Sequence, residues 1–342
     1  MPAPPEVLFD RFFRQNHAKP LRPEDPDPRL YRGKKDLSLL PPLTESLLKS
    51  IQESYNDALL NEKKDVPEHV AHPPFHFDYI DSTVPNAIAF CYESHSFIGV
   101  TMELVNLLWD ICVRLSRSKA VTAILGIQAS PEQQEPTHVV LFRIQLSFVI
   151  SHEYTHHVHG HLSKYVFSDE ILNRGNSGNL EQQAIEVDAD GYAAYHVLAH
   201  LMESEGRLHA LRPVETGYRS NRHPRPSTVF LFCHGHRSFL FALPPVTVSN
   251  PKVYRLSHPP QAARMNSLMQ QAINWCKQNR SALAAWMTLS RFQKLLRIVE
   301  ETTWGMNGGC DWAEQTAFLQ SAEGIEYIKE LDKSFKAHVL AL

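Results

Sequence analysis

Apolar positions recur with the period of a helix in most of the chain and with the period of a strand in a small part of it. Residues 43–63 carry apolar side chains at helical spacing, with Thr44 as a possible cap. Residues 86–101 alternate small and bulky side chains, which predicts a β-hairpin. The same periodicities predict further helices over residues 102–118, 138–163, 180–205, 259–280 and 281–300, and a short strand pair near 228–248. The pattern predicts an α+β, predominantly helical fold with a small β-hairpin or sheet.

A polar stretch rich in histidine and proline separates the first predicted helix from the hairpin. It contains His69, His72 and His76, next to Pro73 and Pro74. Proline-rich polar segments are typical of exposed loops. We therefore interpret these histidines as polar surface residues rather than as a metal site.

The strongest chemical signal follows an apolar run at residues 139–150. That run is apolar enough to form a buried helix, and it leads directly into the motif His152-Glu153-Tyr154-Thr155-His156. Residues four positions apart lie on one face of a helix, so His152 and His156 can reach the same metal ion. The spacing HExxH is typical of a zinc site in which the glutamate, Glu153, activates water as a general base.

The histidine content of the chain makes this motif less specific than it would otherwise be. With 19 His among 342 residues, HExxH can arise by chance. The preceding apolar run argues against chance, because a buried helix rarely carries His, Glu and His without a use. The alternative of a chance match stays open until a third ligand is found.

A second helix supplies a candidate third ligand. Its predicted N-cap is Asn179, with Gln182 three residues later, and we expect the helix to end at Gly206. On this helix Glu186 and Asp190 are four residues apart and share one face. We expect Glu186 to bind the metal and Asp190 to orient a ligand histidine through its other ring nitrogen.

Two other carboxylates on this helix compete with Glu186. Glu181 points well away from Glu186 around the helix, and Asp188 is two positions off its face. The simpler alternative is that Glu186 and Asp190 form the solvated face of an amphipathic helix. His157, His159 and His161 face other directions from His152, and we interpret them as packing or capping residues. Of the three, we expect His161 to matter most, because it follows Gly160 at the end of the helix.

The order of these motifs resembles the gluzincin peptidases of the HtpX and CaaX-prenyl-protease type. HExxH is followed by Gly160-His161 and then by the Glu-x-x-Ala-Asp helix of Glu186. Upstream, residues 85–108 are similar to the hairpin and helix that precede the active-site helix in that group. Downstream, Leu256-Ser257-His258-Pro259-Pro260 and Arg264 resemble its HP-P…R element.

This resemblance implies a zincin-like metallopeptidase core with Zn²⁺ as cofactor and a protein substrate. It also implies that His258 and Arg264 act as catalytic hydrogen-bond donors to the oxyanion, although His258 can equally be a turn residue before the helix at Pro259 or Pro260. The predicted hairpin can be scaffolding or an edge on which substrate pairs.

The relatives of that type are embedded in membranes, and this chain departs from them. No stretch reaches the roughly 18–20 apolar residues that span a bilayer, so no membrane segment is expected. A chain without spans but with this pattern is also similar to the phage-exclusion peptidase Lit, which implies a host-defence protease. The N-terminus lacks a secretory signal, and five cysteines without metal spacing favour reduced thiols, so we expect a cytoplasmic protein.

The net charge and the length of the chain limit which partners and how many domains we expect. The net charge is −3 with dispersed basic residues, which argues against a nucleic-acid partner. One basic, proline-containing segment at residues 207–225 predicts an exposed loop, with docking of an acidic protein as the alternative. We expect an N-terminal extension at residues 1–70, a catalytic domain at 71–300 and a C-terminal helical segment at 301–342. The sequence does not indicate the oligomeric state.

Three functional hypotheses follow from the sequence. The leading one is a zinc endopeptidase in which His152, His156 and Glu186 bind the metal. The second is a catalytically silent, zinc-stabilised interaction protein, and the intact Glu153 argues against it because structural zinc sites need no base. The third is a protease that stays latent until a partner or signal activates it.

Overall fold

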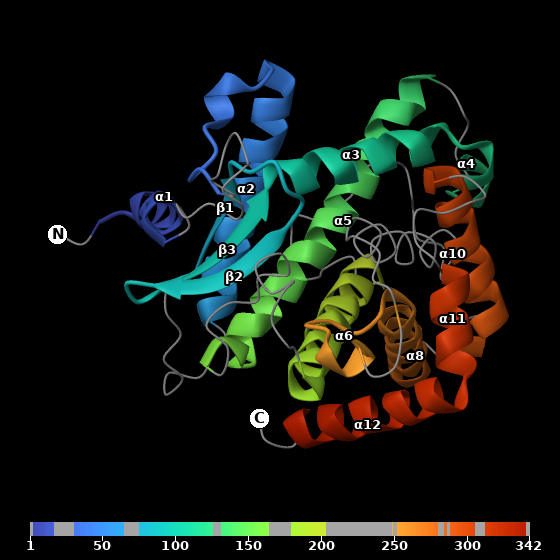
Figure 1. Ribbon diagram of the computed structural model, residues 1–342. Coiled ribbons are helices and arrows are strands. Elements are labelled where there is room, and N and C mark those ends of the chain that lie inside the picture. The colour runs from blue at the N-terminus through green and yellow to red at the C-terminus, as the bar shows by residue number, and fades with distance from the viewer. Residues whose placement is uncertain are drawn as a thin grey trace, which may run out of the picture.

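The computed structural model of the protein describes residues 3–16, 31–64, 75–125, 131–163, 179–202, 248, 252–279, 284–285, 288–304 and 312–339. Within these residues, helices surround one small sheet (Figure 1). This confirms the prediction of a mainly helical α+β fold. The helices are α1 (Pro5–Asn16), α2 (Pro42–Lys64), α3 (Met102–Arg117), α4 (Lys119–Leu125), α5 (Pro131–Val158), α6 (Leu180–Met202), α8 (Gln261–Asn279), α10 (Leu289–Trp304), α11 (Trp312–Gln320) and α12 (Ala322–Val339). The strands are β1 (Phe75–Ile80), β2 (Ala87–Tyr92) and β3 (His95–Thr101), and the short 3₁₀ turns are η1 (Leu37–Leu39), η2 (His161–Ser163) and η5 (Lys252–Arg255).

The sheet has the order β1-β3-β2, with β1 parallel and β2 antiparallel to β3. Successive side chains of a strand point to opposite faces. On β3, Phe97 packs with the aromatic side chains of α1, whereas Ile98 and Val100 join the core formed with α2, α3 and α5. Both faces of the sheet are therefore covered by helices, which explains why all six residues of β1 are buried.

Strand β1 was not predicted, and the assignment of His76 to a surface loop was wrong. His76 lies in β1 and is buried, with its Nε2 3.2 Å from Oδ2 of Asp78. His69 and His72 lie outside the described residues. The segment alternates apolar and polar residues from Phe75 to Tyr79, but it directly follows Pro73 and Pro74, and this led to its assignment to a loop.

The boundaries of several helices also differ from the prediction. Helix α2 begins at Pro42 rather than after Thr44, with a proline at its first position. Helix α8 begins at Gln261. The helix expected from residue 281 is found as α10, which begins at Leu289. The segments at 207–225 and the strand pair expected near 228–248 lie outside the described residues, apart from Val248.

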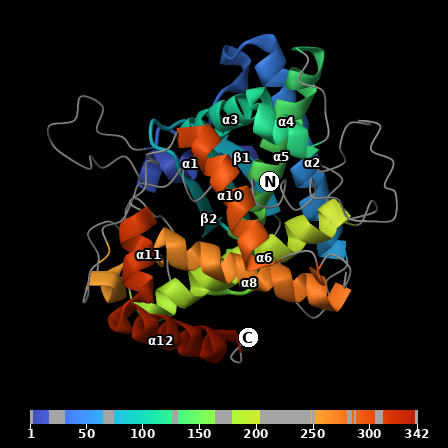
Figure 2. The same ribbon diagram turned by 90° about the vertical axis from the view of Figure 1, so that its right-hand side faces the viewer.

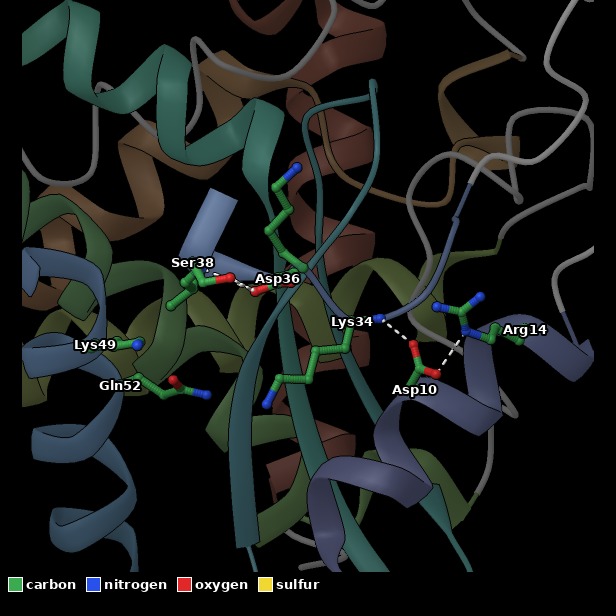
Figure 3. Close-up of a pocket in the computed structure, with 9 residues that line it drawn as sticks. Asp10, Arg14, Lys34, Asp36, Ser38, Lys49 and Gln52 are labelled. Atoms are coloured by element: carbon green, nitrogen blue, oxygen red, sulfur yellow. Dashed lines mark hydrogen bonds and ion pairs between the residues drawn. The ribbon is translucent and has the colours of Figure 1, made fainter. Parts of the chain in front are cut away.

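The N-terminal helix is fastened to the sheet by one aspartate. The Asp10 carboxylate accepts hydrogen bonds from the Arg14 Nε–H at 2.7 Å and from the Lys34 backbone N–H at 2.8 Å (Figure 3). Gly33, at φ +117°, passes so close to this carboxylate that a Cβ would lie 2.3 Å from Oδ1. Lys34 in turn reaches Asp78 of β1 at 2.6 Å. Asp10, Arg14 and Lys34 line one surface pocket, and each of these side chains already bonds to another group of the protein.

Helix α5 runs through the centre of the molecule and carries the site. Its residues 144–156 are all buried, and the helix contacts α3, α6, β2 and β3 (Figure 1). A helix that is apolar all round is buried. Helix α6 crosses α5, and α8 and α12 pack against α6 (Figure 2). No helix among the described residues combines the length and apolar character needed to cross a membrane.

The C-terminal helices pack onto this core. Tyr327 of α12 is buried and donates a hydrogen bond to Oε1 of Gln183 on α6. Helix α10 spans residue 300, where a domain boundary was predicted, and α1 packs directly on the sheet. Of the described parts of the predicted terminal segments, α2 shares a core with α5 and α12 shares one with α6, whereas α1 packs on the sheet.

Candidate metal centre

Two histidines of HExxH face each other near the C-terminal end of α5. His152 and His156 are both buried, and their Nε2 atoms lie 3.3 Å apart. Their rings come together because residues four apart share a helix face. The intervening Glu153 is also buried, at 4% exposure. The motif therefore presents two imidazole nitrogens side by side in an environment shielded from water.

Glu186 of α6 completes a triangle of donor atoms. Its Oε2 lies 3.3 Å from His152 Nε2, and its Oε1 lies 3.7 Å from His156 Nε2. Nitrogen and oxygen ligands held at about 2.0–2.1 Å by a tetrahedral zinc ion stand about 3.3–3.4 Å from one another. Both the chemistry of the donors and their spacing fit zinc. Within the described residues, the group that could hold a metal here contains these three and no fourth protein ligand.

Neighbouring charged groups shift the pKa values of Glu186 and His152. Burial opposes ionisation of Glu186, but His258 and His156 outweigh it and hold its pKa well below the usual range. Burial likewise opposes protonation of His152, yet the hydrogen bonds of Asp190 and Glu186 raise its pKa to about 10. The two carboxylates thus favour positive charge on or next to His152.

Asp190 and Arg264 form a buried pair behind His152. Oδ1 of Asp190 lies 3.1 Å from His152 Nδ1, the nitrogen that faces away from the donor triangle. Arg264 donates to the same carboxylate from Nε and from Nη2, each at 2.8 Å. Although burial opposes ionisation, Arg264 holds the pKa of Asp190 well below its usual range. The structure places Arg264 against Asp190 rather than against the donor triangle.

His258 lies on the opposite side of Glu186. Its Nε2 is 3.2 Å from Glu186 Oε2, and its Nδ1 lies 2.9 Å from the Ser257 hydroxyl. Its side chain is 14% exposed, more than those of His152, His156 and Glu186. It precedes α8, in which the Ala262 N–H bonds to Oε1 of Gln315 and the N–H groups of Ala263 and Arg264 bond to the Pro260 carbonyl. His258 therefore borders the donor triangle.

The helix start predicted at Asn179 is confirmed, because its Oδ1 accepts a hydrogen bond from the Gln182 N–H at 2.8 Å. Glu181 is exposed and stands outside the donor triangle. His157 donates from Nε2 to the Phe97 carbonyl at 2.9 Å, a packing role as expected. Burial lowers the pKa of His157 to about 4, although this backbone bond works in the other direction.

Sequence reasoning missed a second polar cluster beside the first. His159 and His161, interpreted as packing or capping residues, both contact Asp188, at 2.5 and 3.1 Å from its Oδ2. His161 also reaches His156, and His338 of α12 reaches His161. The spacing of Asp188, two positions from Glu186, indicated that it faces elsewhere. No local pattern pointed to His338.

Comparison with known proteins agrees with this geometry. The model of peptidase family M48 matches residues 50–272, which contain HExxH, Glu186, Asp190, His258 and Arg264. No curated protein and no solved structure gave a significant match. The family match covers more than half of the 342 residues and includes the whole donor triangle. The chain therefore belongs to peptidase family M48, a family of zinc-dependent metallopeptidases.

Proposed function

We propose that this chain is a zinc-dependent endopeptidase that hydrolyses peptide bonds of a protein substrate. The observation that carries the proposal is the donor group of His152 Nε2, His156 Nε2 and the Glu186 carboxylate: the two nitrogens lie 3.3 Å apart, and they lie 3.3 Å from Oε2 and 3.7 Å from Oε1 of Glu186, respectively. Zinc in such a site polarises the scissile carbonyl and makes water more acidic. The remaining work belongs to side chains of the protein.

Glu153 is the proposed general base. It sits between the two histidine ligands in sequence and is buried with them. Its carboxylate takes a proton from the attacking water and passes it to the leaving amine. An open fourth position suits this role, and a structural zinc site would instead be closed by four protein ligands. Among the residues that the structure describes, the donor group has three members, which favours an enzyme over a silent, zinc-stabilised interaction module.

His258 and Arg264 have different roles in this proposal. His258 borders Glu186 and is the more exposed of the two, so it is the proposed hydrogen-bond donor to the developing oxyanion. Arg264 is committed to Asp190 by two hydrogen bonds and acts through it. In this arrangement Arg264 holds Asp190, and Asp190 holds the ring of the ligand His152.

The edge of the sheet supports a mode of substrate binding. Strand β2 ends the sheet order and contacts α5, the helix that carries HExxH. We propose that an extended stretch of substrate pairs with this edge, as peptides do on exposed strands. The resemblance to the phage-exclusion peptidase Lit further supports a protein of the producing cell as the substrate.

Removing the metal should abolish proteolysis. We expect cleavage of an unfolded protein such as casein to stop after treatment with EDTA, because the donor triangle alone cannot polarise a carbonyl. Stoichiometric Zn²⁺, but not Mg²⁺, should restore it, since two imidazoles and one carboxylate suit zinc. Gel electrophoresis of the substrate follows the reaction. Cleavage that continues in protein shown to be free of zinc would contradict the proposal.

A further inference from the structure

The second polar cluster is connected to the metal centre through His156. His156 Nδ1 lies 3.0 Å from His161 Nδ1, and His161 Nε2 lies 3.1 Å from Oδ2 of Asp188. His338 Nε2 lies 3.1 Å from His161 Nε2. All four side chains are buried. They come from α5, η2, α6 and α12, so the cluster joins four separate elements.

The number of protons on each ring decides which nitrogen donates and which accepts in these contacts. A neutral imidazole carries one N–H, and a histidine that binds metal through Nε2 carries it on Nδ1. His156 therefore donates from Nδ1, and Nδ1 of His161 must accept. The proton of His161 is then on Nε2, where it points to the Asp188 carboxylate. The result is a chain of donors that runs from the ligand His156 through His161 to Asp188.

The same proton count decides against a second metal ion. The donor atoms of His159, His161 and Asp188 are close enough to hold one. Such an ion would need the lone pair of His161 Nε2, while Nδ1 of the same ring accepts from His156. Both ring nitrogens would then lack a proton, which leaves an unfavourable imidazolate. A hydrogen-bonded chain needs only neutral rings and one acceptor carboxylate, and Asp188 supplies that carboxylate with its Oδ2 against both His159 and His161.

We propose that His161 and Asp188 are positioning residues for the metal ligand His156, and that His338 makes the C-terminal helix part of this arrangement. The inference rests on the proposed zinc role of His156. Hydrogen bonds to the outer nitrogen of a ligand histidine fix its ring and strengthen metal binding. The His161 Nε2–H can be shared between Asp188 and His338 as acceptors. The ring centroids of His161 and His338 lie 5.0 Å apart. Helix α12 follows residue 272, where the family match ends, so the matched region does not include this contact.

The contact ties the end of α12 to the metal centre. The helix lies across one end of α6, and its last turn reaches the end of α5 (Figure 1). Tyr327 anchors the middle of α12 on Gln183, and His338 anchors its end on His161. Movement of this helix would therefore change the surroundings of a zinc ligand.

The test compares two substitutions of His161 in the full chain. Leucine has nearly the volume of histidine but no acceptor, whereas the side-chain oxygen of asparagine takes roughly the place of Nδ1. We expect His161→Leu to weaken zinc binding by about 10–100-fold, the usual cost of losing such a partner. His161→Asn should recover most of the loss. Zinc affinity is measured by competition with a chromogenic chelator, and the melting temperature of the metal-free protein reports on folding.

A packing role would give the opposite order, with leucine better tolerated than asparagine, and that result would overturn the inference. If His161→Leu does not fold, His161→Gln replaces it, because its amide oxygen is displaced from the Nδ1 position and should bind zinc more weakly than asparagine does. His338→Leu should also weaken zinc binding, while Lys336→Ala, an exposed change on the same helix, should not. If His338→Leu bound zinc as tightly as the wild type, the part of the proposal that concerns α12 would be wrong. Failure of the wild type to bind zinc would instead refute the proposed function, and this inference with it.

Discussion

Replacing Glu153 with glutamine should lower the rate of peptide hydrolysis by roughly 10²–10⁴-fold, the usual contribution of a general base. Glutamine has the size of glutamate and retains hydrogen-bonding atoms, but it cannot take a proton from water. Glu153 is not one of the three metal donors, so zinc content should stay at the wild-type level. Steady-state cleavage of a protein substrate, with zinc measured in the same sample, checks both parts.

The matched control is Glu181→Gln, which makes the same chemical change on α6. Glu181 is exposed and lies outside the donor triangle. It should keep full activity and full zinc content. If Glu153→Gln retained wild-type activity, the base would have to be another group, and the assignment of Glu153 would be wrong.

Replacing Arg264 with methionine should reduce the free energy of unfolding of the metal-free protein by about 3–5 kcal/mol, the usual cost of breaking a buried ion pair from one side. Arg264 is 1% exposed and Asp190 is fully buried. Methionine fills much of the space but leaves the Asp190 carboxylate without its main cation. Urea denaturation of the metal-free protein measures the loss without a contribution from zinc binding.

Two further variants separate charge from packing. Asp190→Asn in the Arg264→Met background removes the stranded charge and should recover part of the loss. Arg297→Met removes an arginine that is 75% exposed and pairs with Glu301 on the same helix, so its effect should be within about 1 kcal/mol. Equal stability of Arg264→Met and Arg297→Met would show that the buried pair does not stabilise the fold.

The parts of the site that could be predicted from the sequence are those set by helical period. His152 and His156 meet because four residues make about one turn, and Glu186 and Asp190 share a face for the same reason. The structure brings Glu186 to both histidines because α6 crosses α5 at this level. The direction of Asp188, away from Glu186, also follows from spacing. Its partners His161 and His338 depend on how three helices pack, and no local pattern encodes that.

The fold shows the same division between local pattern and tertiary packing. Residues 86–101 form the predicted hairpin, as β2 and β3, because their alternation is local. Strand β1 pairs with β3 in parallel from a segment about 20 residues earlier, and both of its faces are covered. The Pro73-Pro74 pair just before the strand gave this segment the appearance of a loop. The covering helix α1 is held by Asp10 and Gly33, whose contact is visible only in three dimensions.

The most direct test of the proposed function is the zinc content of purified wild type, His156→Ala and Glu186→Ala, with cleavage of a cell lysate followed in the same preparations. We predict one zinc ion per chain in the wild type, its loss in both variants, and proteolysis only where zinc is present. Substrates that disappear with wild type and persist with Glu186→Ala would identify the proteins it cleaves. Zinc retained at full stoichiometry by both variants, or cleavage without zinc, would contradict the assignment of His152, His156 and Glu186 as the catalytic metal centre.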